Sequence, residues 1–347
     1  MSFFYYASFI PGLQEIAADV IRERLSDVKI HKLIDGAVIF ETDISYDKLN
    51  FFCFNNIFAL INIINNSDDS LENHVRKIIK FTPQRAAGNL PNDTLCNSVL
   101  NTIPIINNNK KIKTFRIVIS NENKPAAIND KLRAEIEKII SILSGLSVNR
   151  TLPDTEFWFL YRSEGFSVFM KRLTLSKTLH KGELPLQLTW VLCRLANLKA
   201  SDTVLDPFCG YGSIPDAAIK YFHITKFITC DNDNKAVKYT KERLKKYKDT
   251  QFIFSDFFKL PTIINKTVDI IVTDPPWGHF KEHGDNQFLQ KMFEVFNKLL
   301  ISGGRVVILY AKDDEFLNNV PPSFKLQNSV PLLLSGKKAV IYCFIKS

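Results

Sequence analysis

From residue 184 onward, apolar runs of strand length alternate with amphipathic stretches of helix length, and this alternation limits the possible folds more than any other feature. The helices are predicted at 185–198, 215–221, 234–247 and 286–300. The strands are predicted at 203–206, 226–230, 251–254, 268–273 and 304–310, with a hairpin-like pair near 324–326 and 339–344. Such alternation with short connections is typical of a mostly parallel sheet covered on both faces, which binds ligands at the carboxyl ends of its strands.

The first half of the chain has a less regular pattern, which predicts an α+β fold. Apolar spacings of three and four residues predict helices at 13–25, 70–80 and 130–143. Ser70 and Asp130 are the expected N-caps of the second and third of these helices. Strands are predicted at 36–40, 114–120, 156–162 and 166–173, the last two as an antiparallel hairpin. The polar stretch 65–70 is a candidate domain boundary, and the Asn-rich segment 81–113 supports no assignment.

Composition excludes several classes of protein. A chain of 347 residues with 46% hydrophobic and 23% charged side chains is not disordered, collagenous or mainly coiled coil. No apolar run reaches the ~18–20 residues of a membrane-spanning helix, and the N-terminal segment lacks the basic region of a signal peptide. The six cysteines form no C-x-x-C pair, so we expect reduced thiols and neither a disulfide framework nor a metal site. These features predict a soluble, cytoplasmic protein.

The positive charge of the chain is unevenly distributed. Residues 1–100 carry 9 basic and 12 acidic side chains, residues 101–178 carry 13 and 7, and residues 179–347 carry 23 and 17. The net charge of +9 therefore arises from the middle of the chain onward. This distribution is typical of a protein with a surface that binds a polyanion. A source organism whose proteins are generally rich in lysine would explain the positive charge equally well.

A glycine-rich turn follows the first predicted strand of the second half, where residues 206–213 have the sequence DPFCGYGS. Gly210 and Gly212 allow the backbone to approach a ligand closely before the next helix begins. A dinucleotide-binding fingerprint would require a small residue at position 215, but this chain has Pro215, and no G-K-S or G-K-T sequence follows. The turn is therefore better suited to a ligand without a pyrophosphate.

Acidic side chains follow the second and third strands. Asp231, 21 residues after Gly210, is placed to accept hydrogen bonds from two ribose hydroxyls, unless Asp231 or Asp233 only caps the next helix. A carboxylate at Asp256 can accept a hydrogen bond from an adenine amino group while Phe257 covers the ring. Capping of a loop is the alternative role of Asp256.

The fourth strand runs into the sequence DPPWG at 274–278, the most informative pentapeptide in the chain. Two prolines hold an extended turn, so that the Pro275 carbonyl is presented outside the sheet. Asp274 and this carbonyl can both accept hydrogen bonds from one planar amino group, while Trp277 stacks on the ring that carries it. Two acceptors on the amine stabilise the positive charge that develops when its nitrogen attacks an electrophile. A tight strand-exit turn without chemistry is the alternative.

Together these motifs resemble class I S-adenosylmethionine-dependent methyltransferases, in which a D/N/S-P-P-Y/F/W signature marks methylation of an exocyclic or amide nitrogen. The segment 179–185 is similar to a motif of one subgroup, the THUMP-domain RNA methyltransferases that form N2-methylguanosine in tRNA. The resemblance implies a Rossmann-like, mostly parallel seven-stranded sheet and S-adenosylmethionine as cofactor. It also implies cofactor-binding roles for Asp206, Pro207, Cys209, Gly210, Gly212, Asp231, Asn232, Asp256 and Phe257, and catalytic roles for Asp274, Pro275, Pro276 and Trp277.

The first half resembles the remaining parts of that subgroup. The sequence FIPGLQEIAA at 9–18 is similar to its N-terminal module, and the elements predicted between 114 and 173 resemble a THUMP domain, which grips the acceptor end of tRNA. The implied domains are a ferredoxin-like module at 1–69, a THUMP domain at 70–175 and the methyltransferase domain at 176–347. Phosphate contacts are expected from Arg116, Lys171, Arg172 and Lys177, with ordinary surface charge as the alternative for each.

Several alternatives to a tRNA guanine-N2 methyltransferase stay open. The DPPW sequence also serves adenine amines, so an N6-adenine or a ribosomal guanine-N2 methyltransferase is possible, and a catalytically silent RNA-binding factor would keep the same fold. Tyr211 stands where the family has a small residue, and Ala217 stands near the position of a typical glutamate. We expect a monomer or weak oligomer without a membrane partner, and the need for a small activating partner protein is left open.

Overall fold

The computed structural model describes residues 2–49, 51–65, 70–80, 112–174, 179–180, 182–277, 285–311 and 316–347. The chain forms two compact units. The first unit contains Met1–Ser8, Ala18–Asn50 and Asn55–Ser176, and the second contains Phe9–Ala17, Phe51–Phe54 and Lys177–Ser347. None of the helices in the described ranges combines the length and the apolar character that crossing a membrane requires.

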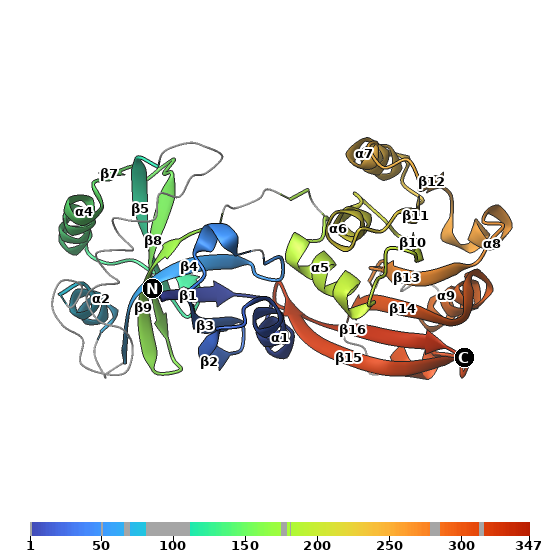
Figure 1. Ribbon diagram of the computed structural model, residues 1–347, viewed down its shortest axis with the longest axis horizontal. Helices are drawn as coiled ribbons and strands as arrows, with labels where there is room; N and C mark the ends of the chain where they lie inside the picture. Colours follow the sequence, from blue (N-terminus) through green and yellow to red (C-terminus); the bar gives the residue numbers. More distant parts are fainter. Residues whose placement is uncertain are drawn as a thin grey trace. The chain divides into compact units, whose positions relative to one another are not determined.

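The first unit is built on one mixed sheet (Figure 1). Its nine strands within the described residues are β1 (Phe3–Ser8), β2 (Lys29–Ile34), β3 (Ala37–Thr42), β4 (Asn56–Asn65), β5 (Thr114–Asn121), β6 (Lys124–Pro125), β7 (Ser147–Val148), β8 (Thr155–Arg162) and β9 (Phe166–Arg172). They are ordered β2-β3-β1-β4-β9-β8-β5-β6, and β7 pairs with β5. Antiparallel pairing of β4 with β9 joins the strands that precede residue 66 to those that follow residue 111 in a single sheet.

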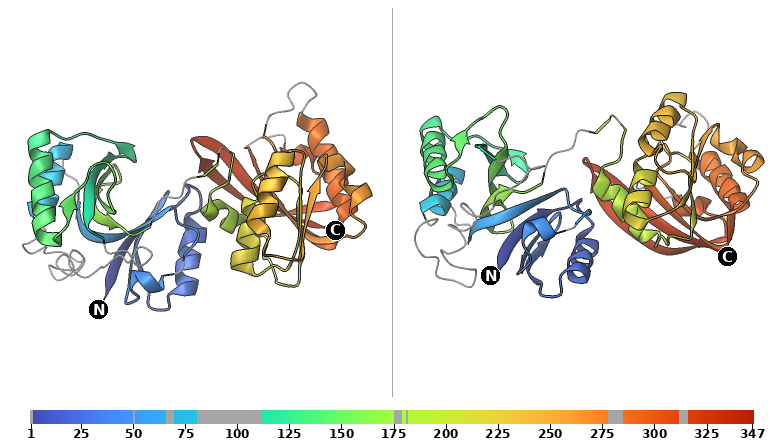
Figure 2. Two further views of the ribbon diagram at one scale, coloured as in Figure 1. Left: turned by 90° about the horizontal axis from the view of Figure 1, so that it is seen from above. Right: turned by 45° about the horizontal axis from the view of Figure 1, so that its top comes forward.

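Helices α2 (Leu71–Lys80) and α4 (Asp130–Ser144) lie side by side on this sheet (Figures 1 and 2), and an Arg76–Glu135 ion pair of 3.2 Å links them. The Ser70 hydroxyl accepts a hydrogen bond from the backbone N–H of Asn73 at 3.3 Å, which confirms its predicted capping role. The predicted N-cap of α4 was wrong by one residue. The side chain of Asn129, not that of Asp130, accepts the N–H of Leu132 at 2.8 Å. Helix α1 (Gln14–Arg24) and a 3₁₀ turn, η1 (Tyr46–Lys48), complete the N-terminal elements.

The second unit contains a seven-stranded sheet within the described residues, ordered β12-β11-β10-β13-β14-β16-β15. Its strands are β10 (Thr203–Asp206), β11 (Lys226–Asp231), β12 (Thr250–Phe254), β13 (Val268–Thr273), β14 (Leu300–Ala311), β15 (Phe324–Leu334) and β16 (Lys337–Lys346). The first five strands of this order are parallel, and β16 runs antiparallel to both of its neighbours. The predicted α/β class and mostly parallel seven-stranded sheet are therefore confirmed.

Helices cover both faces of this sheet (Figures 1 and 2). One face carries α5 (Leu186–Leu195), α6 (Ser213–Phe222) and α7 (Asn234–Leu244), and the other carries α8 (Leu260–Ile263) and α9 (Asp285–Leu299). Two 3₁₀ turns are η2 (Phe257–Lys259) and η3 (Phe316–Asn319). An aromatic core lies under α9, where the Phe293 ring is 5.3 Å from that of Phe324 and 5.7 Å from that of Phe344. This packing fixes the sheet, whose parallel strands end together along one edge.

The predicted and observed elements differ mainly where the hydrophobic pattern is weak. The helix predicted at 185–198 ends at Leu195, and β14 begins at Leu300, four residues before the predicted start. Strand β1 was not predicted because four consecutive side chains of its FFYYAS sequence are buried, so no alternation of apolar and polar residues marks it. Strand β2 lies at a sheet edge, and its half-exposed residues give no clear period either.

Candidate active site

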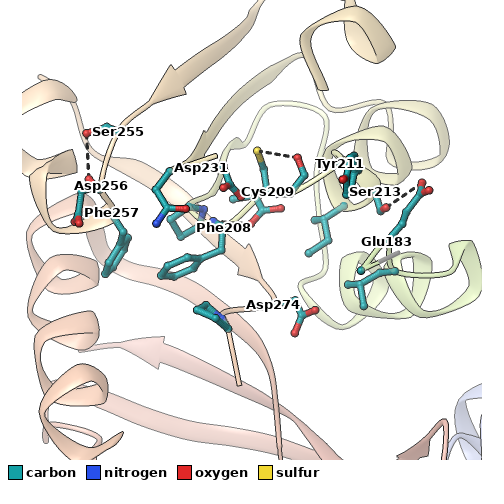
Figure 3. Close-up of a pocket in the computed structure, with 18 of the residues that line it drawn as sticks. Glu183, Phe208, Cys209, Tyr211, Ser213, Asp231, Ser255, Asp256, Phe257 and Asp274 are labelled. Carbon is teal, nitrogen blue, oxygen red and sulfur yellow. Dashed lines mark hydrogen bonds between the residues drawn. The ribbon is translucent and has the colours of Figure 1, made fainter. Parts of the chain in front are cut away.

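A cavity of about 340 Å³ opens where β10, β11, β12 and β13 end (Figure 3). Ten of the residues predicted for the site line it: Asp206, Pro207, Cys209, Gly210, Asp231, Asn232, Asp256, Phe257, Asp274 and Pro276. The other three, Gly212, Pro275 and Trp277, do not line it. The four predicted strand-end motifs thus meet in one cavity, as the rule for parallel sheets leads one to expect.

Ten further residues line the cavity and were not predicted individually as site residues: Gly182, Glu183, Leu184, Phe208, Tyr211, Ser213, Ile214, Ser255, Phe258 and Phe288. The first three belong to the segment 179–185 that the sequence singled out. Most are neighbours of the predicted residues in the same turns, so taking whole loops instead of single positions would have found them. Phe288 of α9 could not be predicted as a site residue, because the sequence of that helix indicates only an apolar face packed against a core.

The glycine-rich turn is shaped by α7 as well as by its own sequence. Gly210 and Gly212 both have left-handed backbone angles, with φ of 48° and 77°. A Cβ atom at Gly212 would lie 2.7 Å from the Thr240 methyl carbon, and the Thr240 hydroxyl donates a hydrogen bond to the Gly210 carbonyl at 2.8 Å. Gly212 therefore lets the turn pack against α7 and does not contact the cavity.

Asp231 lines the cavity and also braces the turn. One of its carboxylate oxygens accepts the Gly210 N–H at 2.8 Å and the other accepts the Asp233 N–H at 2.9 Å. The capping of α7 belongs to Asp233, whose side chain accepts the Lys235 N–H at 2.8 Å. Asp256 has its alternative role, because it caps η2 through the Phe258 N–H at 2.8 Å, and it also lies on the cavity wall.

Two carboxyl groups in the cavity are buried and incompletely hydrogen-bonded. Asp206 is 1% exposed, and its Oδ1 accepts hydrogen bonds from the Thr273 hydroxyl at 3.0 Å and the Phe208 N–H at 3.3 Å. Its Oδ2 and the Oδ1 of Asp274 are buried without a hydrogen-bond partner among the described residues. Burial raises the pKa of Asp206 to about 8 and that of Asp274 to about 7. Each group would therefore gain stability in its charged form from a cation or a donor placed in the cavity.

Trp277 takes a different position from the one expected. Its indole packs against the hydrophobic core that includes α9, and its Nε1 is buried without a hydrogen-bond partner among the described residues. The indole N–H still lies near enough to Asp274 to oppose, in part, the rise of its pKa. In this conformation the indole does not form a wall of the cavity.

The cavity lining is rich in carboxyl groups. Glu183, Asp206, Asp231, Asp256 and Asp274 all contribute, and the described lining residues include no Lys, Arg or His. Figure 3 shows Asp231, Asp256, Asp274 and Glu183 on different sides of the cavity. A site of this composition favours a ligand that carries positive charge and several hydrogen-bond donors.

The segment 182–184 forms one wall and is fastened at two points. Glu183 accepts hydrogen bonds from Arg243 of α7 at 2.5 Å and from the Ser213 hydroxyl at 3.3 Å. The nearby His180 ring stacks on that of Tyr211 at 5.3 Å and contacts the Tyr239 hydroxyl at 2.9 Å. This wall corresponds to the segment 179–185 that the sequence singled out, with residue 181 outside the described residues.

Three of the four residues predicted to contact RNA phosphates, Arg116, Lys171 and Arg172, lie in the first unit and are mostly buried or paired. Arg116 and Arg172 both form ion pairs with Glu156, and Arg172 also donates to Asn56 at 2.6 Å. Lys171 is 3% exposed, and burial lowers its pKa to about 8. Lys177 lies outside the described residues. Of the three that are described, Arg116 has the most accessible side chain, with 40% of it exposed.

Known proteins that resemble this chain are methyltransferases. Residues 175–323 match the model of the RMKL-like methyltransferase domain (UPF0020). A probable tRNA (guanine(10)-N2)-dimethyltransferase of Methanothermococcus thermolithotrophicus is 35% identical over 123 residues, which cover 33% of this chain and 70% of that relative. This chain belongs to that family of S-adenosylmethionine-dependent RNA methyltransferases. The family resemblance inferred from the motifs is therefore confirmed.

Two further comparisons concern a more distant relative and a solved structure. The U6 snRNA (guanine-N(2))-methyltransferase THUMPD2 of Homo sapiens is 26% identical over 190 residues, which cover 52% of this chain and 37% of that protein. This chain spans about a third of the length of the U6 snRNA methyltransferases that it matches. The crystal structure of TrmN from Thermus thermophilus has a TM-score of 0.76 at 19% identity and matches over the full length of both chains, which shows the shared fold.

Proposed function

We propose that this chain binds S-adenosylmethionine in the strand-end cavity and transfers its methyl group to the exocyclic N2 of a guanosine in tRNA. The observation that carries the proposal is the convergence, on one acid-lined cavity, of the glycine-rich turn, Asp231, Asp256 and two residues of the DPPW turn, Asp274 and Pro276. Membership of an RNA methyltransferase family supports it.

The lining residues fit the cofactor. S-adenosylmethionine carries a sulfonium and an ammonium cation, and the cavity offers five carboxyl groups, two of which have an unpartnered buried oxygen. Asp231 would accept the ribose hydroxyls, Asp256 the adenine amino group, and the turn at Gly210 would face the methionine part. When bound, the cofactor supplies an electrophilic methyl group. The role of this chain is to hold that group and to exclude competing nucleophiles.

Asp274 and the Pro275 carbonyl would bind the target amine. Asp274 lines the cavity with one unpartnered oxygen, so an N–H of a guanine N2 amine satisfies a group that is otherwise buried without a partner. With a pKa near 7, the same carboxylate can receive the proton that becomes acidic as the new C–N bond forms. Trp277 would have to turn out of its core position to stack on the base.

The transfer is direct and involves no covalent enzyme intermediate. Cys209 is the cysteine that lines the cavity, and burial together with the nearby Asp206 and Asp231 raises the pKa of its thiol. A protonated thiol is a weak nucleophile, so a mechanism of the pyrimidine-C5 type is disfavoured at this position. Positioning of the amine near the methyl group then supplies much of the rate.

The comparisons favour tRNA over a spliceosomal RNA as substrate. The relative named as a tRNA enzyme is 35% identical and is covered over 70% of its length, against 26% and 37% for the human relative named as a U6 snRNA enzyme. We propose that the chain consists of a ferredoxin-like module at 1–69, a THUMP domain at 70–175 and a methyltransferase domain at 176–347. The first unit would bind the acceptor end of the tRNA.

We also propose that the protein is cytoplasmic and is a monomer or a weak oligomer, with or without a small activating partner protein.

The test is incubation with methyl-labelled S-adenosylmethionine and either tRNA or U6 snRNA, followed by digestion to nucleosides. The proposal predicts labelled N2-methylguanosine from tRNA, formed far more slowly by the Asp274→Asn variant. Label in N6-methyladenosine would overturn the guanine assignment, and label in U6 snRNA alone would overturn the choice of RNA. If the cofactor binds but no RNA is labelled, the silent-factor alternative replaces this proposal.

A further inference from the structure

One short stretch accounts for the positive charge of the C-terminal half. Residues 234–248, which include α7, contain seven basic side chains and one acidic side chain. The rest of the range 179–347 contains 16 of each sign and is therefore neutral. The excess positive charge of residues 179–347 is therefore located on α7 and on the turn that follows it.

These basic side chains are exposed. We call six of them the α7 lysine face: Lys235, Lys238, Lys241, Lys245, Lys246 and Lys248. Lys235, Lys238 and Lys241 lie on α7 at a spacing of three residues, and Lys245, Lys246 and Lys248 lie at its C-terminal end and in the turn that follows. Lys245 pairs with Glu242, while within the described residues the other five have no ion pair.

This arrangement works against the stability of the helix. Like charges three or four residues apart repel each other, and Lys235 in the first turn opposes the helix dipole, whereas Lys241 in the last turn complements it. Lysines that served only for solubility could equally alternate with acids at these spacings, as helix surfaces commonly do. A face of one sign that lowers helix stability is better explained by a partner of opposite charge.

The opposite side of the same helix frames the cavity. Thr240 donates a hydrogen bond to the Gly210 carbonyl at 2.8 Å, and Arg243 donates to the Tyr211 carbonyl at 3.1 Å. Asp231 and Asn232, which directly precede α7, line the cavity. The Tyr239 ring, 39% exposed, lies 5.4 Å from that of Tyr211. The lysines and the cavity therefore belong to one rigid part of the fold.

We propose that the α7 lysine face binds phosphates of the RNA substrate and holds it beside the cavity, an inference that rests on the proposed function. The cavity itself is lined by acids and repels a phosphate backbone, so the methyltransferase unit needs cations nearby to hold RNA at its mouth. Arg116 and Arg172 of the first unit are already paired with Glu156. The exposed ring of Tyr239 adds an aromatic surface of the kind that stacks on unpaired bases.

The test compares two matched double variants for tRNA binding, measured by fluorescence anisotropy over a series of salt concentrations. Lys238→Gln/Lys241→Gln removes two charges from the α7 lysine face. Lys298→Gln/Lys338→Gln removes two exposed lysines, one from α9 and one from the start of β16. The α7 pair should lower the slope of log affinity against log salt by about 2, because each lost phosphate contact lowers it by about 1. The control pair should keep the wild-type slope.

Binding of S-adenosylhomocysteine, measured by calorimetry, should be equal in all three proteins and shows that the cavity has kept its shape. Equal salt slopes for the α7 pair and the wild type would overturn the inference and leave the lysines as a solvated face. RNA binding can be measured without methyl transfer, so the proposed function and the α7 lysine face are tested independently. Loss of slope without N2-methylguanosine formation would refute the proposed function alone, while methylation with an unchanged slope would refute the α7 surface alone.

Discussion

The chemistry of the site depends on two carboxyl groups that the fold places out of water. Asp206 and Asp274 follow adjacent parallel strands, β10 and β13, and each has one buried oxygen without a hydrogen-bond partner among the described residues. Such groups are costly unless a ligand supplies a donor or a cation. We regard this unfavourable burial as the feature that prepares the cavity for a cationic cofactor and an amine.

Asp274 should control the pH dependence of methyl transfer. Burial raises its pKa to about 7, and only the ionised carboxylate can accept both the hydrogen bond and the proton of the target amine. The kcat/KM for RNA, which reports groups of the enzyme before RNA binds, should therefore rise with pH up to about 7 and level off above it. The Asp274→Asn variant should lose about 10²–10³-fold in kcat, a loss typical of removing one positioned polar group. An unchanged pH profile in the variant, or activity near that of the wild type, would contradict this role.

Asp206 should make the folded protein less stable as the pH rises. Its folded pKa of about 8 lies above the value of about 4 in an unfolded chain, so between these values the folded state holds a proton that the unfolded state has lost. The free energy of unfolding then falls with increasing pH, by about 1 kcal/mol per pH unit from this group. Urea unfolding from pH 5 to 8 should show a flatter profile for Asp206→Asn. Parallel profiles for the two proteins would refute the assignment.

At the scale of elements, the site is formed by turns whose shape depends on neighbouring helices. The glycine-rich turn is fixed by the close approach of α7, and the wall at 182–184 is fixed by Arg243 of the same helix. Sequence motifs located the turns correctly, because strand–helix alternation places the strand ends together. They gave no indication that α7 is the common support, because Thr240 and Arg243 read as ordinary helix residues.

Gly212→Ala should test the contact between the turn and α7. The left-handed backbone angle alone costs an alanine about 1–2 kcal/mol, and its Cβ would also meet the Thr240 methyl carbon at 2.7 Å. We expect a loss of at least that size in the free energy of unfolding, together with weaker cofactor binding. Adding Thr240→Ala should recover the steric part of the loss. If the single variant is as stable as the wild type, the packing described for this turn is incorrect.

The sequence predicted some elements better than others for physical reasons. Strand β13 coincides with its prediction because its β-branched side chains favour a strand and Asp274-Pro275 ends it. Strand β1 escaped because it is buried on both faces, and the cap of α4 was displaced by one residue because Asn129 and Asp130 are equally good caps. The position of Trp277 could not be foreseen, because an indole next to a core can pack into it or face the cavity.

At the scale of the whole molecule, catalysis and RNA binding are not assigned to separate units. The second unit holds the cavity and the α7 lysine face, so it contains both the proposed chemistry and a proposed hold on the RNA. The first unit contributes a sheet in which the expected phosphate-binding arginines are paired with Glu156. Recognition of RNA would therefore be shared between the two units instead of belonging to the first alone.

The central claim is that the cavity serves transfer to an exocyclic amine of guanine. The most direct measurement compares label transfer from S-adenosylmethionine to a tRNA transcript made with guanosine and to one made with inosine, which lacks only the N2 amine. Melting curves of both transcripts would verify that each is folded. The account predicts stoichiometric labelling of the guanosine transcript and background labelling of the inosine transcript. Equal labelling of the two transcripts would contradict it.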